Sequence, residues 1–117
     1  MAKYPLTLPD IVSWYCSKRR SLDGWGISLA DIRESAGEKP AAVADFDAAN
    51  SMGRITGWVS GEFDFEALRC SDGRDLLWRH VDVNAIEELE SAYSDFIRIM
   101  LNPDSAGIEA TPAESRR

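Results

Sequence analysis

The run from Gly53 to Gly61 constrains the fold of this chain more than any other segment. It is a short β-favouring stretch with a glycine at each end, and it has the length of one strand. Because a strand turns successive side chains to opposite faces, the run sorts into two unlike sets. Ile55, Gly57 and Val59 form one set, and Arg54, Thr56, Trp58 and Ser60 form the other. The run therefore predicts a strand with one packed face and one face that meets water or a partner.

Four further strands are predicted around this run. They are expected over residues 25–34, 41–49, 63–70 and 76–83, where apolar and polar side chains alternate. Asp72-Gly73 supplies the positive φ angles that a tight hairpin turn requires, and glycine- or proline-containing segments separate the other strands. Short turns place consecutive strands side by side. We therefore expect an antiparallel meander.

Two amphipathic helices are predicted to flank the strands. The first begins at a capping box formed by Thr7 and Asp10, and the second runs over residues 86–101 after a capping box at Asn84–Glu87. Laying both helices on one face of the sheet buries both apolar stripes and leaves the other face open. The predicted class is α+β: helix, five-stranded antiparallel meander, helix, with both helices on one face.

The length of 117 residues suits one domain, which we expect over residues 1–102. The tail, 103–117, has almost no apolar content and is expected to be disordered. The first residues contain no apolar segment of a secretory signal, and no apolar run reaches the roughly 20 residues of a membrane span. Cys16 and Cys70 lack metal-binding or redox spacing. We interpret them as reduced, half-buried thiols of a cytoplasmic protein.

The chain is acidic, with a formal net charge of -7 and a pI of about 4.6. This field repels nucleic acid and anionic membrane surfaces, so neither is expected as a partner. It is typical of a protein selected for solubility or of one with a basic protein partner. The bias is strongest from Asp82 to Phe96, which holds five acids and no base. That segment is either a solvated helix face or part of a partner surface.

The sequence offers few groups for catalysis. The sole histidine, His80, lies beside Trp78 by alternation, a setting more typical of a hydrogen-bonded surface residue than of a catalytic base. Neither a zinc ligand set nor a phosphate-binding glycine motif is present in the sequence, and we expect no cofactor and no metal. The remaining enzymatic option is a group of carboxylates on neighbouring predicted strands. Its members are Asp45, Asp47, Asp64 and Glu66.

The open sheet face is the candidate partner-binding surface. The chain has four tryptophans, and Trp58 and Trp78 are expected side by side on this face, with Arg79 nearby. Exposed aromatic side chains ringed by charge are typical of protein interfaces. The alternative is that Trp58 covers an edge of the core. The candidate residues are Asp45, Asp47, Arg54, Thr56, Trp58, Ser60, Asp64, Glu66, Trp78 and His80.

The same segments resemble the TriTu immunity proteins. The most specific piece is the run Gly53–Gly61, and the similarity extends over roughly residues 8–101. Other matching pieces are Lys39-Pro40, Val43, Asp45-Phe46, Phe65–Leu68, Asp72-Gly73, Leu77–His80 and the closing helix over 86–101. One position departs from the pattern, because Gly57 stands where a bulkier residue is expected before the tryptophan.

The resemblance implies a bacterial protein that binds a cognate antibacterial toxin and blocks it in the cytoplasm of the producing cell. Such toxins are polymorphic and are delivered by contact-dependent systems such as type VI secretion. For the namesake of the family the toxin is an ADP-ribosyltransferase acting on a translation elongation factor. The implied role is stoichiometric binding without catalysis. We expect the chain itself to be a monomer or weak homodimer. A small acidic secretion chaperone or adaptor remains the alternative, followed by a carboxylate-based enzyme.

Overall fold

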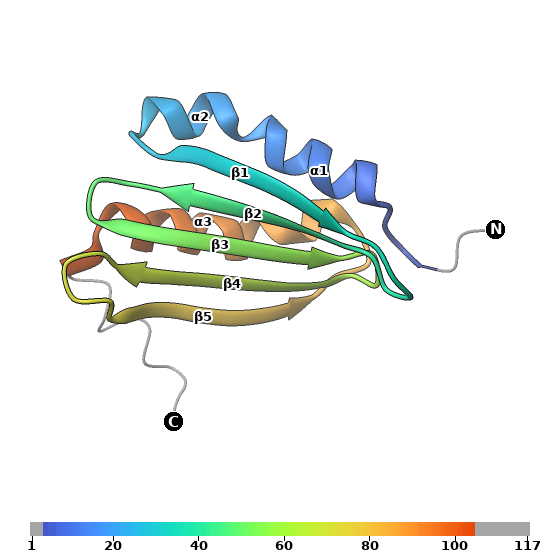
Figure 1. The fold of residues 1–117 in the computed structure, drawn as a ribbon. Coiled ribbons are helices and arrows are strands. Elements are labelled where there is room, and N and C mark those ends of the chain that lie inside the picture. The colour runs from blue at the N-terminus through green and yellow to red at the C-terminus, as the bar shows by residue number, and fades with distance from the viewer. Residues whose placement is uncertain (1–3, 105–117) are drawn as a thin grey trace.

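The computed structural model describes residues 4–104, which form a five-stranded antiparallel sheet with its helices packed on one face (Figure 1). The strand order is β1-β2-β3-β4-β5, so the predicted meander and the α+β class are confirmed. The elements are α1 (Leu8–Ser17), α2 (Arg19–Gly24), β1 (Ser28–Ser35), β2 (Ala41–Asp47), β3 (Ser51–Trp58), β4 (Glu62–Arg69), β5 (Asp75–Asp82), the 3-10 turn η1 (Ile86–Leu89) and α3 (Glu90–Leu101).

The two predicted helix starts have different outcomes. The Thr7 side chain accepts a hydrogen bond from the Asp10 backbone N–H at 3.2 Å, which confirms the first cap. The capping box predicted at Asn84–Glu87 is wrong. There the chain enters a 3-10 turn at Ala85 without a side-chain cap, and the α-helix begins only at Glu90. The tighter turn provides backbone hydrogen bonds that replace the missing cap.

Two predicted strand boundaries also shift. The first strand was expected from residue 25, but α2 extends to Gly24, and Ile27 then donates its backbone N–H back to Leu22 O. Gly26 closes this helix end with a φ of 80°, so β1 begins at Ser28. The strand expected from Gly53 begins two residues earlier, at Ser51, so the turn before β3 ends at Asn50.

The core lies between the sheet and the helices. Phe46, Phe63 and Phe65 point from β2 and β4 into this layer and are at most 1% exposed. The ring of Phe96 in α3 meets those of Phe46 and Phe65 edge-on, at centroid distances of 5.2 and 5.8 Å. Trp14 in α1 packs against Phe63, at 6.3 Å. The aromatic contacts therefore tie both helices to the same face of the sheet.

Two glycines of β3 allow this close packing. A Cβ at Gly57 would overlap the ring of Phe63, and one at Gly53 would lie 2.5 Å from Cζ of Phe96. The missing side chains leave room for these rings against the strand backbone. The position of Gly57 thus has a physical reason: Phe63 fills the space that a larger residue would take.

Tyr15 links α1 to the middle of the sheet. The residue is 1% exposed, and its hydroxyl lies 2.8 Å from Ala42 O and 3.3 Å from Ile55 O. Burial raises the pKa of Tyr15 far above its ordinary value, so the hydroxyl keeps its proton. It donates to β2 while lying against β3, and it fixes the position of α1 over the sheet.

Three expectations concern the rest of the chain. The cysteines are exposed, so the interpretation of Cys16 and Cys70 as half-buried thiols is wrong. The tail predicted over 103–117 lies outside the described residues from 105 onwards. Within residues 4–104, no helix combines the length and apolar character needed to cross a membrane.

Candidate binding surface

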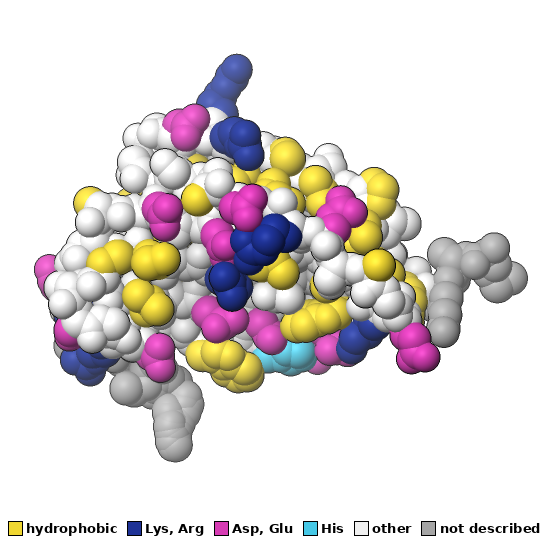
Figure 2. Space-filling view, in the orientation of Figure 1, with side chains coloured by type: hydrophobic (Ala, Val, Ile, Leu, Met, Phe, Trp, Pro, Cys, Tyr) yellow, Lys and Arg dark blue, Asp and Glu magenta, His cyan; other side chains and the backbone are white. Residues whose placement is uncertain are grey.

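The sheet face turned away from the helices is the candidate surface, and it faces the viewer in Figures 1 and 2. The strand register arranges its side chains in rows that run across the strands. The charged row consists of Asp31, Asp45, Arg54, Glu66 and Trp78. The apolar row lies beside it, toward the β2–β3 turn, and consists of Asp47, Met52, Leu68 and Asp75. The histidine row lies on its other side and consists of Arg33, Val43, Thr56, Asp64 and His80.

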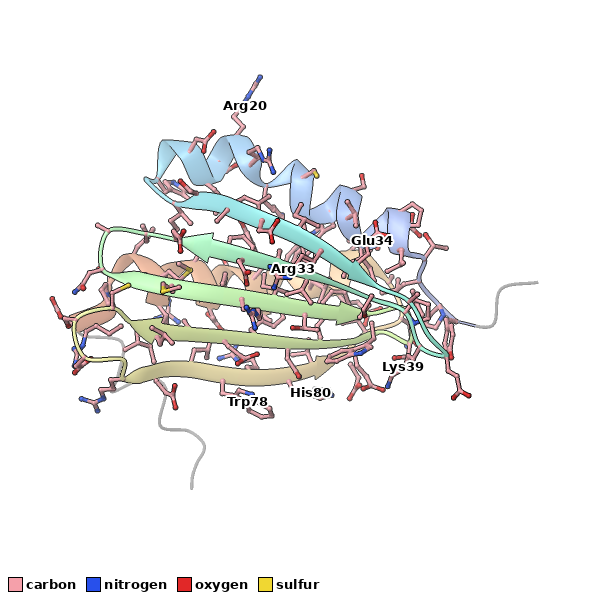
Figure 3. All side chains as sticks on the ribbon, in the orientation of Figure 1. Arg20, Arg33, Glu34, Lys39, Trp78 and His80 are labelled. Carbon is pink, nitrogen blue, oxygen red and sulfur yellow. The ribbon has the colours of Figure 1, made fainter. Side chains whose placement is uncertain are left out.

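Asp45 is the centre of a network of ion pairs in the charged row. Arg33 Nη1 lies 2.7 Å from one of its oxygens and Arg54 Nε lies 2.7 Å from the other. Arg33 also reaches Asp31 at 2.6 Å. Partial burial disfavours the charged form of Asp45, but the hydrogen bonds from Arg54 and Arg33 outweigh it and lower the pKa. Figure 3 shows Arg33 in the middle of this face, and Figure 2 shows basic side chains there bordered by acidic ones.

His80 carries a second ionic contact on the same face. Its Nδ1 lies 2.6 Å from Asp64 Oδ1, and its Nε2 lies 3.4 Å from Asp82 Oδ1. The hydrogen bond to Asp64 raises the pKa of His80 above the ordinary value of 6.5. This side chain is therefore the group on the face whose charge responds most to pH near neutrality.

The two tryptophans of this face are not neighbours, contrary to the sequence prediction. Trp78 lies in the charged row opposite Glu66, whereas Trp58 pairs with Ala41 beyond the histidine row. Trp78 is 67% exposed, and Trp58 is half-buried with Lys39 Nζ 5.7 Å from its ring centroid. The expectation that Arg79 joins this surface is also wrong. Arg79 turns toward α3 and pairs with Asp95 at 2.7 Å.

A groove lies over the charged and apolar rows, with a volume of about 570 Å³. It extends from Asp31 in β1 to Trp78 in β5, and Met52 in its middle is 49% exposed. Figure 2 shows hydrophobic side chains gathered at this end of the face with acidic ones around them. The groove thus combines an exposed apolar floor with a charged border, which is the composition of a protein-binding site.

The structure disperses the four carboxylates that made up the enzymatic option. Asp45 is held by two arginines and Asp64 by His80. Glu66 lies opposite Arg54, and Asp47 lies opposite Met52 in another row. Within residues 4–104, no group of three or more His, Cys, Asp or Glu side chains could hold a metal ion. No two of the four carboxylates therefore lie opposite each other on neighbouring strands, as a paired-carboxylate site would require.

The structure brings eight of the ten candidate residues into the three rows. Trp58 lies outside them, and Ser60 lies in the turn after β3, where its hydroxyl contacts Glu62 at 3.4 Å. The list of candidate residues left out Arg33, Met52 and Leu68, which also lie on this face. The register of the first hairpin places Arg33 there, and strand alternation from Arg54 and Glu66 would have found the other two.

The acidic segment lies on the other side of the sheet from Glu87 onwards, whereas Asp82 lies beside His80 on the open face. Glu90 pairs with Lys18, the residue between α1 and α2, at 2.8 Å, and Asp95 pairs with both Arg79 and Arg98. Parts of this acidic charge are therefore balanced internally. Because α3 covers the opposite face, it does not form one continuous surface with the three rows (Figure 1).

Comparison of the sequence with known proteins identifies a family. No curated protein matches the chain. Residues 9–99 match the family model described as "Immunity protein TriTu". The matched range includes α2, all five strands and η1 in full, together with most of α1 and α3. Because this range covers well over half of the sequence, the chain belongs to the TriTu immunity-protein family.

Proposed function

We propose that this immunity protein neutralises a cognate toxin by covering part of the toxin with its open sheet face. The observation that carries the proposal is the face itself, where a groove of about 570 Å³ lies beside an ion-pair network and an exposed tryptophan. Among the described residues, every helix packs on the other face. A folded toxin domain is the kind of partner that such a surface fits.

The size of the face supports this proposal. Strands of seven or eight residues give it a length of roughly 25 Å, and five strands give it a width of roughly 20 Å. The flat projection is roughly 500 Å², and side-chain relief brings the accessible area closer to the roughly 800 Å² that each partner contributes to a standard protein interface. A toxin seated on the sheet alone could form a stable complex.

The toxin class that we propose is an ADP-ribosyltransferase effector, as the resemblance to the family's namesake implies. It would be a polymorphic toxin delivered by a contact-dependent system such as type VI secretion. The chain would act in the cytoplasm of the producing cell, as a stoichiometric binder rather than an enzyme. We propose that it is a monomer or weak homodimer before it meets the toxin. A chaperone role would require binding to an unfolded segment, and no feature of the described surface favours that alternative.

Co-expression with the toxin tests the proposal directly. The toxin domain encoded beside this gene should arrest growth when expressed alone, and this chain should restore growth. The two proteins should also elute together on gel filtration with one copy of each. If the chain neither rescues growth nor forms a complex with the adjacent toxin, the proposed function is wrong.

Variants can locate the interface in the same assay. Met52→Lys and Thr56→Arg place bulky charge on the open face, at an exposed and a half-buried position. Glu87→Lys and Glu88→Lys are matched controls on the helix side, where both residues are exposed. We expect the two sheet variants to lose rescue while both controls retain it. If only the helix-side variants lose rescue, the interface lies on the helix side and our proposal is wrong.

A further inference from the structure

We propose that the groove over the charged and apolar rows receives an arginine side chain of the toxin, which stacks on Trp78 between acidic residues. This inference rests on the proposed function and adds the chemistry of the contact. The groove is about 570 Å³ in volume, larger than one side chain needs, so the residues flanking that arginine would also enter it. The occupant is thus a basic segment on the toxin surface.

The charge of the groove is the first argument. Five acidic residues line it, and Arg54 is the one basic residue of the lining: Asp31, Asp45, Asp47, Glu66 and Asp75 are the acids. Arg33 and Arg54 balance two of these acids, because they pair with Asp31 and Asp45. Among residues 4–104, the other three acids have no ion-pair partner within 4 Å. The groove therefore carries unbalanced negative charge and favours a cation.

The position of Glu66 strengthens this argument. It lies between Arg54 on β3 and Trp78 on β5. The hydrogen bond to Asp45 raises the pKa of Arg54 and the Glu66 charge contributes to this, but the Nε of Arg54 is directed to Asp45 at 2.7 Å, and Arg54 and Glu66 make no ion pair within 4 Å among the described contacts. An incoming cation above Trp78 would meet the Glu66 carboxylate on the side toward the groove. Glu66 thus has both the charge and the place to receive a partner.

Trp78 provides the stacking surface. It is 67% exposed, an unusual state for the largest apolar side chain, and it belongs to the lining of the groove. A tryptophan face attracts cations more strongly than other aromatic rings do. Figure 3 shows Trp78 and His80 projecting from β5 at the lower edge of the sheet. The ring is therefore accessible from the groove and from the β5 side.

The floor of the groove suits the stem of a long basic side chain, and the groups around it favour arginine over lysine. Met52 and Leu68 face each other across β3 and β4, and Met52 is 49% exposed. They offer apolar contact to the aliphatic stem of a long basic side chain. Asp75 lies opposite Leu68 at the other end of this contact. A planar guanidinium can stack on an indole and still donate hydrogen bonds to two carboxylates, which an ammonium group does less well.

The test compares groove variants with matched variants elsewhere, using the complete chain and the toxin domain encoded beside it. Glu66→Gln with Asp75→Asn removes two groove acids, and Glu87→Gln with Glu88→Gln removes two exposed acids on the helix side. Trp78→Ala is matched by Trp25→Ala, since Trp25 is 51% exposed outside the groove. Association and dissociation rates would be measured by surface plasmon resonance at low and moderate salt, with melting curves to verify folding.

We expect removal of the two groove acids to weaken binding about 10-fold, chiefly by slowing association at low salt. Trp78→Ala should weaken binding about 30-fold by speeding dissociation, as for an interface hot spot, and Trp78→Phe should recover part of the loss. Both matched controls should bind like wild type. Changing one arginine of the toxin to lysine should lower the affinity, and changing it to alanine should lower the affinity further. The toxin with that alanine should bind wild type and Trp78→Ala with equal affinity.

Several results would overturn this inference. If wild type binds the toxin and the groove variants bind equally well, the groove inference fails while the proposed function stands. Equal weakening by the groove pair and the control pair would reduce the effect to net charge. A dimer that Trp78→Ala dissociates, or tighter toxin binding after removal of residues 105–117, would assign the groove to a second copy or to the chain's own C-terminal segment. If wild type does not bind the toxin at all, the proposed function itself is wrong.

Discussion

Trp58 and Trp78 project from the same sheet face but lie two strands and two rows apart. With strands about 4.8 Å apart and about 3.4 Å per residue, this separates them by roughly 10 Å across the strands and roughly 14 Å along them. They are therefore two contact points rather than one aromatic cluster. A partner that touches both must cover most of the face, including the Asp45 network between them.

Loss of Asp45 should affect binding far more than stability. Asp45→Ala removes the carboxylate that joins Arg33 and Arg54, and both arginines are about half exposed, at 45% and 51% of the side chain. Exposed ion pairs contribute little, so the free energy of unfolding should change by less than about 1 kcal/mol. Toxin affinity should fall, because Arg54 would lose its ion-pair partner and Arg33 would keep only Asp31. Trp58→Ala should weaken binding too. Denaturant melts and calorimetric titration measure the two effects, and if both variants bind like wild type, the wrong face has been chosen.

His80 should titrate above its ordinary range. Its hydrogen bond to Asp64 raises its pKa above 6.5, so the pair stabilises the fold at pH values below about 6.5. That stabilisation is lost as the pH rises through the pKa of the folded state. Because the ring is 38% exposed, solvent screening keeps the contribution small. Nuclear magnetic resonance can follow this sole histidine without ambiguity, and Asp64→Asn should return its pKa toward 6.5. An unchanged titration in Asp64→Asn would contradict the assigned cause.

Gly57→Ala should destabilise the fold by about 1–3 kcal/mol, the usual effect of overpacking a core. The added Cβ would overlap the Phe63 ring, which is fully buried and cannot move aside freely. Gly24→Ala is the matched control, since a Cβ there meets no atom within 4 Å. Thermal and urea melts measure both variants, and Gly57→Ala with Phe63→Leu should regain part of the lost stability. Equal stability of Gly57→Ala and wild type would refute the packing explanation for this glycine.

Loss of the hydroxyl should destabilise the fold at Tyr15 but have little effect at Tyr93. Tyr15→Phe should lower the free energy of unfolding by about 1–2 kcal/mol, because its hydroxyl donates to Ala42 O inside the core. Tyr93→Phe should stay within about 0.5 kcal/mol of wild type, since its buried hydroxyl has no hydrogen-bond partner among the described residues. Urea unfolding of both variants provides the comparison. A larger loss in Tyr93→Phe than in Tyr15→Phe would contradict the assigned contacts.

Much of the fold follows from local sequence patterns. Alternation around Ile55 and Val59 placed both on the packed side, and both are at most 5% exposed. Asp72-Gly73 marked the β4–β5 turn, where Gly73 has a φ of 72°. These features succeed because strand period and turn chemistry are properties of neighbouring residues.

The relative positions on the face could not be derived in the same way. Trp58 and Trp78 were assigned to one face correctly, but their distance depends on the register of two hairpins and on the bulge near Leu68. The direction of Arg79 followed from alternation with Trp78, yet its charge suggested solvent. Only the packing of α3 against the sheet shows that the Arg79 guanidinium donates a hydrogen bond to Asp95. The groove likewise requires the assembled sheet, since its lining comes from all five strands.

Side-chain footprinting of the complex tests the central claim most directly. Hydroxyl radicals oxidise exposed tryptophan and methionine, and the chain carries suitable reporters on both sides of the fold. Met52 and Trp78 report on the open face, at 49% and 67% exposure, whereas Trp25 reports on the end of α2, at 51%. We predict that the bound toxin protects Met52 and Trp78 from oxidation and leaves Trp25 unchanged. Protection of Trp25 with undiminished oxidation of Met52 and Trp78 would contradict an interface on the open sheet face.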